Sequence, residues 1–170
     1  MAKPSVIFFS VISMILTVLG AVDISAATNR PAPTTEPAAP PPDPYTPGLG
    51  DFMTAYVQPH HIKLWLAANA GNWQLAAYEA SELRETFEDI STYQATWKNA
   101  PVAKLVETII APTLKDVDAA IARKDLTAFQ TDFTALTAGC NSCHSKVHHG
   151  FLIIQVPRAN PFSDQEFTPR

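Results

Sequence analysis

The sequence predicts an all-α protein, an antiparallel four-helix bundle with an irregular C-terminal tail. From Asp51 onward, apolar residues recur at intervals of three and four, which is the period of an amphipathic helix. Glycine is rare in this part of the chain, and strand-like alternation does not occur before residues 151–156. Four apolar faces on helices of about twenty residues, joined by short connections, are most simply buried in an antiparallel bundle.

Residues 1–27 have the composition of a secretory signal segment. Lys3 provides a charged start, an apolar run extends from Val6 to Val22, and small residues at positions 25–27 provide a cleavage site. The run is nearly as long as a short membrane span, so an uncleaved N-terminal membrane anchor is the alternative to cleavage. In both cases the rest of the chain is expected to be exported, and the expected location is the periplasm.

Residues 28–48 are rich in Pro, Ala and Thr, with three consecutive prolines at positions 40–42. Such a segment cannot continue a helix or a central strand, and it is predicted to be a semi-rigid linker. The folded bundle is expected at residues 49–150. Residues 151–170 are an apolar run followed by a Pro-rich stretch, and they are expected to pack across the bundle as a C-terminal extension.

The first two helices can be placed from their start and stop signals. Helix one is expected at about residues 50–70, with a kink at Pro59 and with Gly71 ending it. Asn72 is a favourable N-cap for helix two, which is expected to continue to about residue 93. Helix two has an acidic face, predicted to be exposed to solvent, with docking of a basic redox protein as the alternative. This face carries Glu79, Glu82, Glu85, Glu88 and Asp89.

Two prolines occur in the third predicted helix, and the two cysteines occur in the fourth. Helix three has Pro101 in its first turn, where a missing amide costs nothing, and Pro112 is expected to bend it. Helix four is predicted at about residues 125–148, and Cys140 and His144 continue its apolar face. The cysteines are therefore expected within a helix.

Charge and cysteine content restrict the class of partner. The formal net charge is −4, and a mildly acidic chain does not have the clustered Lys and Arg that nucleic acid requires. No nucleic-acid partner is expected.

The two cysteines, Cys140 and Cys143, would first suggest a disulfide in an exported protein, because that compartment is oxidising. The spacing of the two cysteines must therefore distinguish a disulfide from other kinds of cysteine site.

Residues 140–144 read Cys-Asn-Ser-Cys-His, the C-x-x-C-H motif of covalent haem attachment. In a helix these positions share a face, so Cys140 and Cys143 can meet one porphyrin edge while His144 ligates the iron as the proximal ligand. A zinc site would need two more ligands, and a thioredoxin-like dithiol would need a βαβ context. A chance disulfide is the remaining alternative. The sequence therefore predicts one covalent haem c.

With this motif near the end of the last of four helices, the chain resembles the class II c-type cytochromes, the cytochrome c-prime type. The resemblance covers about residues 51–149 and rests on Cys140, Cys143, His144 and the helix pattern. The chain departs from that family in its Pro-rich leader and in the residues that follow the motif. The resemblance implies a four-helix bundle, and it implies a homodimer as the oligomeric state.

The resemblance also implies where the residue opposite His144 lies, which is in the first half of helix one. Met53 or His60 is the candidate distal iron ligand there, and a Met ligand would raise the reduction potential. His61 points about 100° away from His60 on an intact helix, so only one of them can face the iron. The alternatives are a core Met53, a histidine that binds a haem propionate, and an iron with no distal protein ligand.

Two more histidines, His148 and His149, follow the motif. His148 is expected on the haem-facing side of helix four and His149 is expected to be more exposed. They are predicted to be surface residues, and an accessory metal site shared with His60 and His61 is the alternative. The cationic candidates for pairing with the haem propionates are Lys63, Arg84, Lys98, Lys104 and Arg123.

Electron transfer is the function that these features favour, with periplasmic redox proteins as partners. The alternative is a five-coordinate haem protein that binds nitric oxide or other small gases. A peroxidase or reductase with His60 or His61 as the distal acid/base is a third hypothesis, and the chain is not expected to be an enzyme. Contact with a membrane is expected only if the signal segment stays uncleaved.

Overall fold

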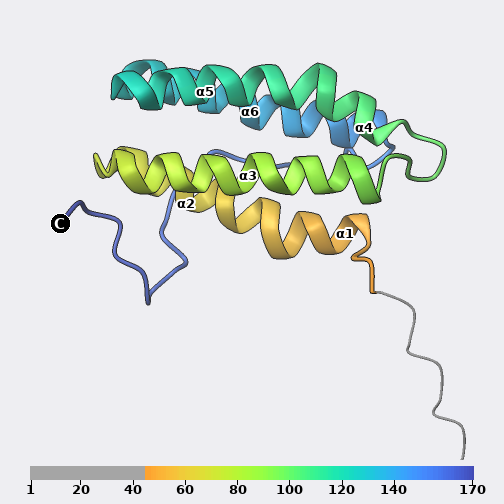
Figure 1. Cartoon of the computed structure of the whole chain (residues 1–170), viewed down its shortest axis with the longest axis horizontal. Coiled ribbons are helices and arrows are strands. Elements are labelled where there is room, and N and C mark those ends of the chain that lie inside the picture. The colour runs from red at the N-terminus through yellow and green to blue at the C-terminus, as the bar shows by residue number, and fades with distance from the viewer. Residues whose placement is uncertain (1–44) are drawn as a thin grey trace, which may run out of the picture. The chain divides into compact units, whose positions relative to one another are not determined.

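The computed structural model describes residues 45–170 (Figure 1), so the expected signal segment and the linker up to residue 44 lie outside the described residues. In the described part helices are the regular structure, no strand is formed, and one isolated bridge joins Trp97 and Ala100. None of these helices is long and apolar enough to cross a membrane. The all-α prediction is confirmed for this part. The elements are α1 (Leu49–Asp51), η1 (Phe52–Val57), α2 (Gln58–Asn69), α3 (Trp73–Tyr93), α4 (Val102–Leu105), η2 (Val106–Ile110), α5 (Ala111–Arg123) and α6 (Leu126–Lys146).

Two of the four helical segments contain a π-helical stretch. The π-helix η1 joins α1 to α2, and η2 joins α4 to α5, so residues 49–69 and residues 102–123 are each continuous helix. Each π stretch ends two residues before a proline, Pro59 or Pro112. Proline has no amide hydrogen for the ordinary bond to residue i−4, and a wider turn lets the helix continue past it. A π turn thus lies just before each of the two prolines at which a kink was predicted.

Local signals account for the helix ends. The Asn72 side chain caps α3 by accepting from the Leu75 amide at 3.1 Å, and Gly71 before it adopts a φ of 74°. The Asp125 side chain caps α6 in the same way, accepting from the Ala128 amide at 3.0 Å. These caps explain why neighbouring helices are separated by only two or three residues at this end of the molecule.

The helices pack along one another in two layers. α2 lies against α3, α5 lies against α6, and α3 joins the layers through α5 (Figure 1). Phe129 and Phe133 of α6 are fully buried, and the Trp65 ring of α2 lies 5.0 Å from the Phe133 ring. Buried aromatic side chains of this size contribute strongly to the stability of a small core.

The C-terminal segment, residues 151–170, follows the helices back toward the start of α3. Phe167 is 6% exposed and belongs to the core, and Val156 and Phe162 pack against it. Near the chain end the Asn72 side-chain amide donates to the Thr168 carbonyl at 3.4 Å. Val156, Phe162 and Phe167 thus attach the segment to the core at separate points, while most residues between 151 and 170 are exposed.

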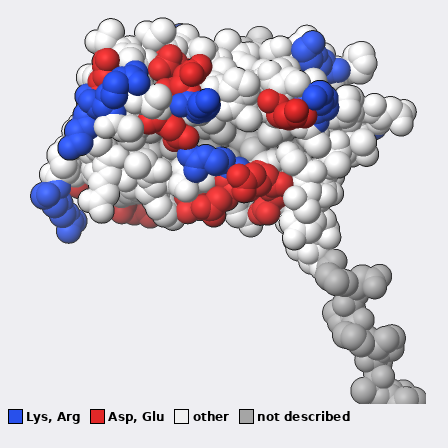
Figure 2. All heavy atoms as spheres, turned by 45° about the horizontal axis from the view of Figure 1, so that its top comes forward, with Lys and Arg blue, Asp and Glu red and all other residues white. Residues whose placement is uncertain are grey.

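The acidic face of α3 is not uniformly exposed. Glu79 is 1% exposed and lies beside His60, with 2.7 Å between His60 Nδ1 and Glu79 Oε2, so the expectation that it faces solvent is wrong. Arg84 of α3 pairs with Asp118 of α5 at 2.6 Å. On the face that Figure 2 shows, Lys and Arg side chains lie among Asp and Glu side chains. Surface charges of both signs are thus interspersed there.

Candidate functional site

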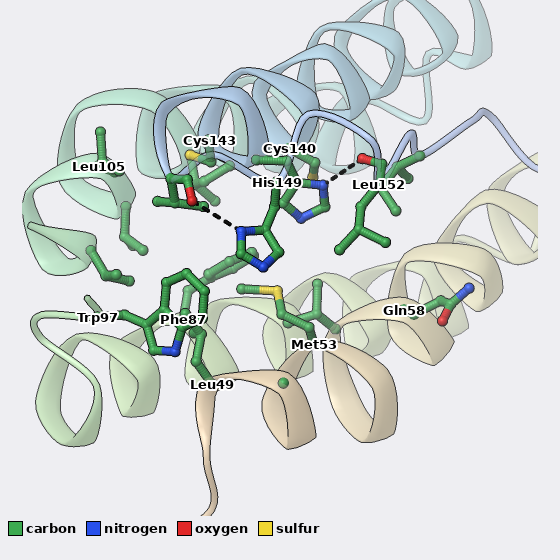
Figure 3. A pocket seen from close by; sticks show the side chains of 18 of the residues that line it. Leu49, Met53, Gln58, Phe87, Trp97, Leu105, Cys140, Cys143, His149 and Leu152 are labelled. Carbon is green, nitrogen blue, oxygen red and sulfur yellow. Dashed lines mark hydrogen bonds between the residues drawn. The ribbon is translucent and has the colours of Figure 1, made fainter. Parts of the chain in front are cut away.

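A cavity of about 470 Å³ lies between α6 and the helical segment that contains η1 (Figure 3). This volume is within the range of about 300–1,000 Å³ that is usual for small-molecule and cofactor sites. Most of the lining is apolar, and it includes Leu49, Met53, Val57, Phe87, Trp97, Val102, Leu105, Val106, Ile110, Val147, Leu152, Ile153 and Ile154. The polar exceptions include Thr54, Gln58, His61, His144 and His149.

The predicted haem-attachment residues lie together on one wall of this cavity. Cys140, Cys143 and His144 belong to the last turns of α6, and all three line the cavity. The two cysteines are not joined in a disulfide. Burial raises the pKa of the Cys140 thiol to about 12 and also raises the pKa of Cys143.

The His144 ring is held by a single backbone group. Its Nδ1 lies 2.9 Å from the Leu152 carbonyl oxygen, which can only accept a hydrogen bond (Figure 3). In the neutral ring Nδ1 therefore carries the hydrogen, and Nε2 keeps its lone pair. Metal-ligating histidines are commonly held in this tautomer, with the other ring nitrogen bonded to a carbonyl or carboxylate.

The opposite wall is formed by the π-helical stretch η1. Met53, Thr54 and Val57 of η1 line the cavity, and Met53 lies across it from Cys140 and Cys143 (Figure 3). The second π stretch, η2, contributes to the lining as well. Single π turns inside helices occur frequently at functional sites, because the extra residue changes which side chains face inward.

The two histidines of α2 are placed differently from expectation. His60 does not line the cavity, since its ring is bonded to Glu79. His61 does line it, is 4% exposed, and lies with its Nε2 at 2.9 Å from Thr137 Oγ1. The Thr137 hydroxyl donates to the Phe133 carbonyl, so it accepts from His61 Nε2. Burial lowers the pKa of His61 to about 4, and the ring is therefore neutral at pH 7.

The two histidines after the motif have the opposite placement to the one predicted, because His148 is exposed and His149 lines the cavity. α6 ends at Lys146, and His148 adopts a left-handed φ of 61° and is exposed. His149 lines the cavity instead, with its ring 4.7 Å from the Trp97 ring and its Nδ1 3.0 Å from the Val147 carbonyl. Within residues 45–170 no group of three or more His, Cys, Asp or Glu side chains is arranged to hold a metal ion.

None of the cationic candidates lines the cavity. The ammonium of Lys98 sits 4.4 Å from the centre of the Trp97 ring, which is part of the lining. Arg84 is paired with Asp118 and Lys104 with Glu107. Lys98 therefore lies beside a residue of the cavity wall.

Comparison with protein-family models, with curated proteins and with solved structures found no match to this chain. The cavity brings together two protonated thiols, an imidazole with a free Nε2 and, across from them, a thioether.

Proposed function

We propose that this chain is an exported mono-haem c-type cytochrome of the class II type that transfers electrons in the periplasm. The observation that carries the proposal is that Cys140, Cys143 and His144 line one wall of a cofactor-sized apolar cavity, with Met53 on the opposite wall. We also propose that the four helical segments form the antiparallel bundle of that class. Periplasmic redox proteins are the proposed partners.

The residues of the cavity fit a covalent haem c. Cys140 and Cys143 would hold it through thioether bonds, and His144 Nε2 would be the proximal iron ligand. The bound haem supplies an iron that alternates between the ferrous and ferric states. The apolar lining excludes water from the site, which lowers the solvent rearrangement that accompanies a change of charge. The packed helices around it keep the ligating side chains in one geometry.

Met53 is the distal ligand that the geometry supports best. Its thioether lies on the wall opposite the motif, whereas the His60 ring is bonded to the buried Glu79 carboxylate and is not part of the lining. A Met ligand favours the ferrous state and raises the reduction potential, which suits an electron carrier. This is the reason for preferring electron transfer over gas binding.

Binding of nitric oxide or another small gas is the second candidate function. It is favoured by the apolar side chains around Met53, Leu49 and Val57 among them, which would leave the distal side of the iron dry if Met53 did not ligate. Carbon monoxide distinguishes the two. With Met53 bound, carbon monoxide must displace it, so the wild type binds slowly and Met53→Ala binds faster. Equal rates would favour the gas-binding function.

Covalent attachment is tested in a host that has a cytochrome c maturation system. The wild type is expected to give a haem-staining band that survives denaturing electrophoresis, and the pyridine haemochrome spectrum of a c-type haem. Cys140→Ala/Cys143→Ala is expected to abolish the band. Ser142→Ala, which changes the same motif and keeps both thiols, is the matched control and is expected to retain it. A wild type without the band would overturn the proposed function.

A further inference from the structure

The C-terminal extension contacts the motif directly, through residues 151–156, which we name the strap. Resting on the haem site proposed above, we propose that the strap holds the proximal ligand His144 and that Asn141 is the positioning residue that holds the strap. Asn141 is the first of the two residues between the cysteines of the motif. The C-terminal extension would then influence the reduction potential of the iron and its bond to His144.

Asn141 forms a two-bond clamp with the strap. Its side-chain amide donates to the Ile154 carbonyl at 2.9 Å, and its side-chain oxygen accepts from the Ile154 amide at 2.8 Å. One side chain thereby satisfies both backbone polar groups of a single strap residue, as a neighbouring strand would do. Both groups are partly buried, so leaving them without partners would be costly.

The acceptor of the His144 hydrogen bond lies two residues before this clamp. The Leu152 carbonyl accepts from His144 Nδ1 at 2.9 Å, and the Leu152 amide donates to the His149 carbonyl at 2.9 Å. The Leu152 backbone is therefore held by a turn on one side and by the Asn141 clamp on the other. Together these hydrogen bonds restrain Leu152, an exposed residue, beside the imidazole.

The far end of the extension is anchored independently. Phe167 is buried in the core, and Phe162 packs against the core with its ring 5.0 Å from the Lys63 ammonium. Loss of the Asn141 clamp would therefore release the strap locally, while the rest of the extension stays attached. This separates the positioning role of Asn141 from the general stability of the fold.

The carbonyl contact has a chemical consequence for the iron. A hydrogen bond from Nδ1 to a carbonyl increases the electron density at Nε2 and fixes the plane of the ring. A more basic imidazole stabilises the ferric state and strengthens the bond between iron and nitrogen. The strap is thus expected to lower the reduction potential that a Met ligand alone would set.

The test compares Asn141→Ala with Asn160→Ala. Asn160 is an exposed residue of the same extension whose side-chain oxygen accepts from the Phe162 amide at 2.8 Å, so it is a matched control away from the motif. Resonance Raman of the ferrous protein after photolysis of bound carbon monoxide reports the iron–His144 stretch. Asn141→Ala is expected to shift this band to lower frequency and to raise the reduction potential, whereas Asn160→Ala leaves both unchanged.

Graded and independent readouts complete the test. Asn141→Asp keeps the acceptor for the Ile154 amide and loses the donor to the Ile154 carbonyl. The iron–His144 band of Asn141→Asp is therefore expected to shift less than that of Asn141→Ala. In the wild type the Ile154 amide is expected to be protected from hydrogen exchange, and this holds even if the Asn141 variants fail to fold. A haem-containing Asn141→Ala protein with an unchanged band and potential, or rapid exchange at Ile154, would overturn the inference alone. A wild type without covalent haem would overturn the proposed function itself.

Discussion

Removing the His60 imidazole tests the pairing of α2 with α3 and, at the same time, the choice of iron ligand. The Glu79 side chain is 2% exposed and the His60 side chain is 17% exposed, and 2.7 Å separates His60 Nδ1 from Glu79 Oε2. The His60→Ala substitution leaves the Glu79 carboxylate buried without this partner. The second carboxylate near the ring, Glu82, is 4.0 Å from His60 Nε2. As another acceptor, it cannot replace the hydrogen bond that Glu79 loses.

The expected loss of stability follows from the burial of Glu79. Leaving a buried hydrogen-bonding group without its partner costs about 1–3 kcal/mol, and more when the group is charged. Because the His60 side chain is partly exposed, water can enter the space that it leaves, and the expected loss is about 2–3 kcal/mol. Replacing both groups with apolar side chains removes the orphaned charge, so His60→Leu/Glu79→Leu is expected to lie within about 1 kcal/mol of the wild type.

Urea unfolding at pH 7 measures these free energies, and the visible spectrum of each folded variant reports the iron ligands. The His60→Ala spectrum is expected to match the wild type, because His60 does not line the cavity. A loss of stability below about 0.5 kcal/mol would refute the role of the buried pair, since surface substitutions have effects of that size. A change to a high-spin spectrum would show that His60 ligates the iron.

Three further predictions concern burial. Burial lowers the pKa of His61 to about 4 from 6.5, so protons favour the unfolded chain as the pH falls through this window. Between pH 7 and pH 5 the wild type should lose about 2 kcal/mol more than His61→Leu in urea unfolding, and equal losses would contradict this. A Cβ on Gly139 would lie 3.3 Å from Ile109 Cγ2, so Gly139→Val should cost about 1–3 kcal/mol, whereas Val at the exposed neighbour Ala138 should cost little. Phe167→Ala should cost about 3–5 kcal/mol and expose residues 151–170 to limited proteolysis, and unchanged resistance would show that the anchor is unimportant.

Local sequence patterns were sufficient to predict much of the helical structure. The helix that carries the motif was predicted at residues 125–148 and is formed at Leu126–Lys146. Asn72 caps its helix and Gly71 precedes it in a left-handed conformation, as the sequence predicts. These features depend on neighbours a few residues apart, so the sequence alone contains the necessary information.

The different placement of His60 and His61 from the one expected has a geometric origin. An ordinary helix turns about 100° per residue, and on that assumption Met53 and His60 share a face. The π stretch η1 inserts one extra residue into a turn, so the inward position after it moves from His60 to His61. Pro59 marks the place in the sequence, but neither a kink nor a π turn is specified by proline alone.

The sequence by itself therefore determined the helical class, the helix ends and the clustering of Cys140, Cys143 and His144 on one helix face. Only the tertiary structure decided that Glu79 is buried, that His61 rather than His60 lines the cavity, and that residues 151–156 reach back to the motif. The physical reason is the separation along the chain of the residues that interact. Caps and helical faces follow from bonds between near neighbours, whereas burial and the path of the C-terminal extension depend on contacts between segments far apart in the chain.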